Sequence, residues 1–219
     1  MDLYSDIARR IEHSYLKPDA TYSKIEELCR EAVENRFYGV CINPFFVKFV
    51  KDLLKNTQLK VITVIGFPLG ANKLKTKLIE ASSAVNDGAD ELDIVWNIGA
   101  FKSKDYTYVE EELKTIIYYT QNVTHKIIVE TAYLTDEEKE KSVQIVINSG
   151  AEFIKTSTGF APSGAKISDV KLFKEKAKGR IKIKAAGGIR DFKTAVSMIN
   201  AGADRIGTSH GVDIILDKG

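Results

Sequence analysis

Three charged residues lie inside largely apolar segments of this sequence. Asp93 falls in ELDIVWN, Lys155 in EFIKTS and Lys184 in IKIKAAG. Charged side chains are seldom buried unless they are paired, so the three are expected to face one another. Two lysines beside one carboxylate leave one positive charge without a partner, and both a neighbouring cation and burial lower the pKa of a lysine. The pattern therefore predicts a neutral amine, which can attack a carbonyl carbon and form a Schiff base.

The residues that follow each lysine suggest which of the two is the nucleophile. Lys155 is followed by hydroxyl residues at positions 156–158, which could orient a carbinolamine, so we assign it as the nucleophile. Lys184 would stay protonated, and Asp93 would move protons with Lys184 or with a bound water. A structural ion network is the alternative interpretation, because such networks also shift pKa values.

Glycine-rich segments after two apolar runs suggest a site for an anionic group. AAGGIR spans residues 185–190 and GTSH spans residues 207–210. Glycine lets backbone N–H groups approach an anion closely, and the GVDIIL that follows is predicted to be a short helix whose N-terminus favours negative charge. A substrate anchored here by its phosphate would reach a neighbouring strand with its other end. The expected substrate-binding residues are Thr158, Gly159, Gly187, Gly188, Gly207 and Ser209.

Eight short apolar runs alternate with helical patterns along the chain. Such runs are typical of parallel strands buried on both faces. Their centres lie near residues 11, 42, 64, 93, 128, 154, 183 and 206. The spacing of roughly 28 residues is close to one βα unit of a (β/α)8 barrel of about 250 residues. We therefore predict an α/β fold, a single-domain (β/α)8 TIM barrel over residues 1–219, rather than an open doubly wound sheet, since no GxGxxG follows the first strand.

Side-chain alternation predicts that the charged trio points into the barrel. Successive side chains of a strand face opposite sides. Leu92 and Ile94 are apolar and are expected to face the helices, which turns Asp93 toward the barrel interior. Ile154 and Ile183 are likewise expected to face the helices, which turns the lysine after each of them toward the interior. All three charged residues lie toward the C-terminal ends of their strands, where barrel enzymes build their sites.

Capping signals and a repeated glycine predict where helices begin and end. Thr135 with Glu138, and Ser23 with Glu26, have the spacing of a capping box. The related segments NDGADELDIV, NSGAEFIKTS and NAGADRIGTS each place a glycine shortly before a strand. A helix that ends near a glycine in the left-handed conformation explains this repeat.

Composition limits the classes of partner. The formal net charge is only +2, so we expect no nucleic-acid partner, which would require a clustered basic excess. No apolar run approaches the ~18 residues of a membrane span, and the N-terminal segment lacks the apolar core of a signal peptide. Cys29 and Cys41 suit a reducing cytoplasm. The three histidines show no metal-ligand spacing, so we predict neither a metal nor a cofactor.

Seven motifs resemble the deoxyribose-phosphate aldolase family, in order and across essentially the whole chain. They are IEHSYLKP, VCINP, TVIGFPLGAN, ELDIVWNIGA, FIKTSTGF, IKAAGGIRD and RIGTSHGV. The resemblance implies a metal-free class I aldolase that reversibly cleaves 2-deoxy-D-ribose 5-phosphate to D-glyceraldehyde 3-phosphate and acetaldehyde. It implies Lys155 as the Schiff-base lysine and Lys184 and Asp93 as proton donor and acceptor. It also implies phosphate ligands at Gly187, Gly188 and Ser209.

Several positions depart from the family pattern or keep two interpretations. The first motif commonly reads Asp-His-Thr, whereas this chain has Glu12 before His13, which leaves the placement of that acid open. His210 stands where small residues are usual. Glu130, at the end of a strand, could bind water in the site or only form a structural pair.

Two other functions compete with the aldolase hypothesis. One is a Schiff-base lyase or transferase for a different phosphorylated sugar, and the other is a catalytically silent sugar-phosphate-binding protein. The intact Lys155, Lys184 and Asp93 count against the silent protein. The expected assembly is a homodimer or a higher homo-oligomer.

Overall fold

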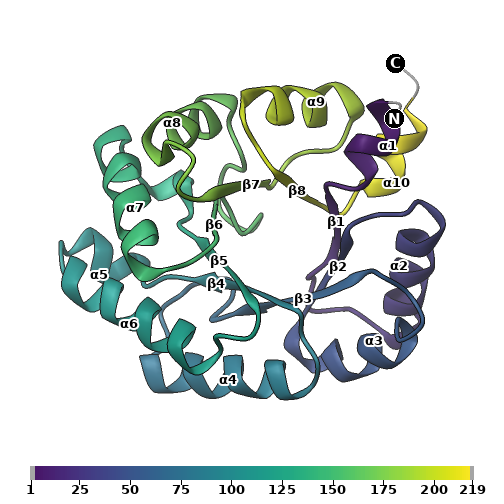
Figure 1. Ribbon diagram of the computed structural model, residues 1–219, viewed down its shortest axis with the longest axis horizontal. Coiled ribbons are helices and arrows are strands. Elements are labelled where there is room, and N and C mark those ends of the chain that lie inside the picture. Colours follow the sequence, from purple (N-terminus) through teal and green to yellow (C-terminus); the bar gives the residue numbers. More distant parts are fainter. Residues whose placement is uncertain (1–2, 218–219) are drawn as a thin grey trace.

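A closed barrel of eight parallel strands forms the centre of the protein (Figure 1). The computed structural model describes residues 3–217, so residues 1, 2, 218 and 219 of the predicted domain lie outside it. The strands pair in sequence order, and β8 closes the barrel against β1. The strands are β1 Ile11–Tyr15, β2 Gly39–Ile42, β3 Lys60–Ile65, β4 Glu91–Val95, β5 Thr124–Ile128, β6 Phe153–Lys155, β7 Lys182–Ala186 and β8 Arg205–Thr208. The predicted TIM barrel is confirmed, and the open doubly wound sheet is excluded.

Helices form a ring around the barrel (Figure 1). The α-helices are α1 Leu3–Ala8, α2 Tyr22–Glu34, α3 Val47–Leu53, α4 Leu74–Asn86, α5 Ile98–Lys102, α6 Tyr106–Tyr119, α7 Asp136–Ser149, α8 Ile167–Ala177, α9 Phe192–Ala201 and α10 Gly211–Leu216. Short 3-10 turns, η1 Pro44–Phe46 and η2 Thr131–Tyr133, follow β2 and β5. From α6 to α10 each helix packs against the next, and α1 lies beside α10.

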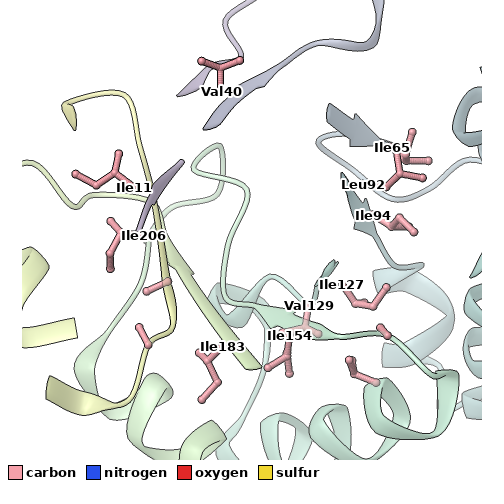
Figure 2. Packing of buried hydrophobic residues seen from close by; sticks show 14 of the residues in the cluster. Ile11, Val40, Ile65, Leu92, Ile94, Ile127, Val129, Ile154, Ile183 and Ile206 are labelled. Atoms are coloured by element: carbon pink, nitrogen blue, oxygen red, sulfur yellow. The ribbon is translucent and has the colours of Figure 1, made fainter. Parts of the chain in front are cut away.

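The apolar core lies between the strands and the helices. Figure 2 shows Ile127, Ile154 and Ile183 pointing from their strands toward the surrounding helices. These side chains, like Leu92 and Ile94, have no exposed surface. Burying such a side chain stabilises the fold by about 1.5–3 kcal/mol relative to leaving it exposed. The predicted alternation is confirmed, so the residues between these apolar positions face the barrel interior.

The two predicted capping boxes have different outcomes. The box of Thr135 and Glu138 is present at the start of α7, with both reciprocal hydrogen bonds. The prediction for Ser23 and Glu26 is wrong, because α2 begins at Tyr22, two residues earlier than a cap at Ser23 allows. Thr21 is the N-cap, with extended backbone (φ −107°, ψ 160°), and its side chain accepts a hydrogen bond from the Lys24 amide. Ser23 is already part of the helix.

The repeated glycines end helices as predicted. Gly88, Gly150 and Gly202 have φ values of 103°, 86° and 116°, the left-handed region that a Cβ atom disfavours. Each lets the chain turn from a helix into the next strand. Among residues 3–217, no helix is long and apolar enough to cross a membrane.

Candidate active site

Asp93 lies at the centre of a buried cluster of amines. Its Oδ2 lies 2.7 Å from Nζ of Lys155 and 2.5 Å from Nζ of Lys184. Lys155 ends β6 and is the register partner of Lys184 on β7, so the two lysines enter the barrel side by side. None of the three side chains is more than 3% exposed. The structure therefore brings together the three residues that the sequence analysis singled out.

A third lysine, which the sequence analysis missed, holds the other oxygen of Asp93. Nζ of Lys126, on β5, lies 3.0 Å from Oδ1 of Asp93. Lys126 also pairs with Glu91 and lies 3.5 Å from Oε2 of Glu12. Strand alternation could have identified Lys126, because Ile127 faces the helices and the preceding side chain therefore faces the barrel interior. With Oδ1 held by Lys126, Oδ2 is left to the other two lysines.

Glu12 reaches the cluster despite its departure from the family pattern. Its Oε2 pairs with Nζ of Lys184, and its Oε1 lies 3.9 Å from Nε of Arg205. Lys184 thus has two carboxylate partners, whereas among residues 3–217 Lys155 has an ion pair with Asp93 alone. Lys155 is therefore the lysine of this cluster with the fewest ion pairs.

Opposing effects fix the protonation of the groups around Lys155. Burial acts to raise the pKa of Asp93, but the ammonium groups of Lys126, Lys155 and Lys184 together hold it well below its ordinary range. Burial acts to lower the pKa of Lys184, but the carboxylates of Asp93 and Glu12 outweigh burial and raise it above its usual value. Asp93 is therefore ionised and Lys184 protonated at neutral pH.

A cavity of about 670 Å³ opens at the C-terminal ends of the strands. Lys155 and Lys184 line it, while Asp93 lies fully buried. Lys17 and Arg190 add positive charge to the lining. The predicted substrate-binding residues all line this one cavity: Thr158, Gly159, Gly187, Gly188, Gly207 and Ser209.

The loops that follow Lys155 and Lys184 are fixed against each other beside this cavity. Gly187 and Gly188 have φ values of 88° and 78°, which residues with a side chain rarely adopt. A methyl group on Gly164 would lie 2.9 Å from Cα of Gly187 and closer still to its carbonyl group. The N–H of Ala165 is shared between the carbonyls of Ala186 (3.1 Å) and Gly187 (3.0 Å). This close backbone contact positions the glycine pair that was predicted to hold a phosphate.

The segment after β8 gives room to Lys184 and leads into a short helix. A methyl group on Gly207 would lie 3.0 Å from Cε of Lys184, so the absence of a side chain there leaves space for the lysine. Ser209 is exposed in the loop before α10, which is the predicted GVDIIL helix. Nδ1 of His210 lies 2.8 Å from Oδ2 of Asp213, and both residues line the cavity.

The hydroxyl groups after Lys155 have different surroundings. Thr156 donates to the carbonyl of Ala186 and accepts from its N–H, which joins β6 to β7. Ser157 is fully buried. Thr158 lines the cavity, and its hydroxyl donates to Glu130. Of the three, Thr158 is the one placed to meet a substrate.

His13, His210 and Cys41 also line the cavity. His13 pairs with Glu31 and His125 with Thr120, and both cysteines are buried and free. Within residues 3–217, no group of three or more His, Cys, Asp or Glu side chains is arranged to hold a metal ion.

A closed parallel barrel with a lysine-lined cavity at the C-terminal ends of its strands defines an enzyme of the (β/α)8 class. Within that class, the chain belongs to the DeoC/LacD aldolase family, whose model matches residues 5–217. The protein is therefore an aldolase.

Known proteins similar to this chain bear out the family. The chain is 54% identical to a deoxyribose-phosphate aldolase of Aquifex aeolicus over 209 residues, which cover 95% of this chain and 94% of that protein. It is 50% identical to a deoxyribose-phosphate aldolase of Thermococcus kodakarensis over 214 residues, with 96% of both covered. Among solved structures, an aldolase called QR15 matches with a TM-score of 0.93 and 54% identity, covering 96% of this chain and 94% of that one. A tetrameric deoxyribose phosphate aldolase from Aeropyrum pernix matches with a TM-score of 0.91 and 33% identity, covering 97% and 90%.

Proposed function

We propose that this aldolase reversibly cleaves 2-deoxy-D-ribose 5-phosphate to D-glyceraldehyde 3-phosphate and acetaldehyde through a Schiff base. The reaction serves the degradation of deoxyribose phosphates in the cytoplasm and needs neither a metal nor a cofactor. The proposal rests on one observation above all: Lys155 and Lys184 share Oδ2 of Asp93 at the wall of one cavity. The relatives named deoxyribose-phosphate aldolase support the substrate.

Lys155 supplies the nucleophile. Its unprotonated amine attacks C1 of the open-chain sugar, and loss of water from the carbinolamine gives a protonated imine. Lys155 suits this role because it lines the cavity and has the fewest ion pairs in the cluster, so the fewest contacts hold its nitrogen away from a substrate. Once formed, the imine carries a positive charge in the position of the ammonium group and keeps its attraction to Asp93.

Asp93 and Lys184 then move protons around this imine. A base removes the proton of the C3 hydroxyl, the C2–C3 bond breaks, and its electron pair is taken up by the imine to give an enamine. Lys184, which is protonated, and Asp93, which is ionised, form a hydrogen-bonded donor and acceptor pair for this step. Proton return to C2 and addition of water release acetaldehyde and restore Lys155.

We place the phosphate at the glycine-rich loops that line the cavity. Gly187, Gly188 and Ser209 are proposed to hold it, and Thr158 and Gly159 are proposed to contact the rest of the substrate. Lys17 and Arg190 line the same cavity and favour a dianionic group by their charge. We assign to Gly207 a supporting part in binding, since it provides the space that Lys184 occupies.

Assembly is part of the proposal. We propose a homodimer or a higher homo-oligomer, because the similar structure from Aeropyrum pernix is described as tetrameric. No nucleic acid or membrane is required by this function.

Turnover of purified protein tests the proposed reaction. Deoxyribose 5-phosphate is supplied, and D-glyceraldehyde 3-phosphate is followed by a coupled assay. The wild-type protein is expected to turn over and Lys155→Ala to be inactive. Lys182→Ala, which removes an exposed lysine from the other end of the same sheet, is the matched control and should keep activity. A wild-type protein without turnover on this sugar, or full activity in Lys155→Ala, would refute the proposal.

A further inference from the structure

Glu130 has an unusual backbone conformation for a buried residue. It follows β5 with φ 54° and ψ 72°, in the left-handed region, and its side chain is 1% exposed. Three other non-glycine residues described by the structure have positive φ, namely Arg36, Lys104 and Lys178, and all three are exposed. Left-handed backbone costs free energy for a residue with a Cβ atom, and such strain persists only where surrounding contacts impose it.

The contacts that impose this conformation come from the segment after β6. The amide of Thr158 donates to Oε2 of Glu130 over 3.1 Å, and the hydroxyl of Thr158 donates to the same oxygen. Backbone hydrogen bonds join the two segments on either side of Glu130. The amide of Val129 donates to the carbonyl of Lys155, and the amide of Thr131 donates to the carbonyl of Thr156. The left-handed turn at Glu130 therefore places its carboxylate against Thr158, one strand away.

Thr158 connects Glu130 to the wall of the cavity. Its Oγ1 accepts a hydrogen bond from the amide of Phe160 over 3.0 Å, which closes a tight turn at Gly159. Thr158, Gly159 and Phe160 all line the cavity together with Lys155. A single carboxylate oxygen thus fixes the turn that faces the reacting end of the substrate.

Stability alone is a poor explanation for this arrangement. Burial raises the pKa of Glu130, although the hydrogen bonds of Thr158 and the charge of Lys155 act in the opposite direction. Among the residues that the structure describes, its second oxygen, Oε1, is buried without a hydrogen-bond partner. A strained backbone and a buried carboxylate with one unpaired oxygen both lower the free energy of unfolding. The benefit that offsets this cost is therefore the fixed position of Thr158.

We propose that Glu130 is a positioning residue, which holds the turn of Thr158 to Phe160 beside Lys155 so that the cavity wall is ordered before the substrate binds. The inference deepens the proposed aldolase function and depends on it for the kinetic part of its test. Glu130 acts through Thr158 and does not itself touch the substrate.

Three single variants and one double variant test this role kinetically. Glu130→Ala and Thr158→Val are each expected to lower kcat/KM for deoxyribose 5-phosphate by about 10-fold or more, since each breaks a hydrogen bond to a carboxylate. The double variant should lose less activity than the product of the two single losses, because both changes remove the hydrogen bond from the Thr158 hydroxyl to Glu130. Glu130→Gln should restore most of the activity, since its amide oxygen can accept both hydrogen bonds. Glu111→Ala, at an exposed position on α6, is the control.

Hydrogen exchange tests the same contact without reference to activity. The amide of Thr158 should exchange at least about 10-fold faster in Glu130→Ala than in the wild type, and at the wild-type rate in Glu130→Gln. Three results would each overturn the inference. The losses of the two single variants could multiply in the double variant, Glu130→Gln could lose as much activity as Glu130→Ala, or the Thr158 amide could exchange at an unchanged rate. If the wild-type protein shows no turnover, the proposed function fails, and hydrogen exchange alone decides the role of Glu130.

Discussion

Gly164→Ala should loosen the contact between the two loops that form the proposed phosphate site. The added methyl group would lie 2.9 Å from Cα of Gly187, whereas ordinary contacts of a Cβ atom begin at about 3.4 Å. The loops must therefore separate, and the shared hydrogen bond of Ala165 to the carbonyls of Ala186 and Gly187 is weakened or lost. One such bond contributes about 0.5–1.5 kcal/mol, and 1.4 kcal/mol corresponds to a factor of 10. We expect KM for deoxyribose 5-phosphate to rise by up to about 10-fold.

The assay compares two substrates that differ only in the phosphate. KM for unphosphorylated deoxyribose should change little in Gly164→Ala, because the position of Lys155 does not depend on this contact. Gly99→Ala is the matched control: Gly99 is exposed on α5, and its added methyl group meets only Oδ1 of Asn97, at an ordinary 3.5 Å. An unchanged KM for the phosphorylated sugar, or equal increases for both substrates, would refute the argument that this contact positions the phosphate.

Three further predictions follow from the charges of the site. Gly188→Asp should raise KM for deoxyribose 5-phosphate by about 10-fold or more while sparing deoxyribose, since like charges ~4 Å apart near a surface repel by roughly 4 kcal/mol; equal effects would place the phosphate elsewhere. The folded-state pKa of Asp93 lies well below its ordinary 3.8, so below about pH 3.8 the unfolded chain takes up this proton first, and the free energy of unfolding should fall by ~1.4 kcal/mol per pH unit. Urea unfolding between pH 5 and pH 2.5 should show this contribution in the wild type and not in Asp93→Asn. Turnover should survive exhaustive EDTA treatment, and loss of activity that Zn²⁺ restores would contradict an amine mechanism without metal.

The central trio could be predicted because strand alternation is a local rule. Ile154 and Ile183 each precede a lysine, and the same apolar face that packs on the helices turns Lys155 and Lys184 into the barrel. The same rule applied to Lys126 and Ile127 would have found the third lysine. Lys126 is the third of five residues in β5 and the register partner of Asp93 on β4, so it lies at the same height in the barrel.

Contacts that depend on the exact path of loops could not be predicted. Glu130 was left between two roles because its left-handed backbone arises only from the packing of the segments after β5 and β6. The close approach of Gly164 to Gly187 depends in the same way on two loops far apart in the sequence. The start of α2 was misplaced by two residues because Thr21 and Ser23 are both good N-cap residues, and the backbone decides between them.

Trapping of the Schiff base tests the central assignment, Lys155 as the nucleophile, most directly. The wild-type protein is treated with acetaldehyde and borohydride, which reduces the imine to a stable N-ethyl-lysine, and the modified peptide is identified by mass spectrometry. The account predicts the ethyl group on Lys155 and no active-site adduct in Lys155→Ala. An adduct on Lys184 in the wild-type protein, or none on either lysine, would contradict it.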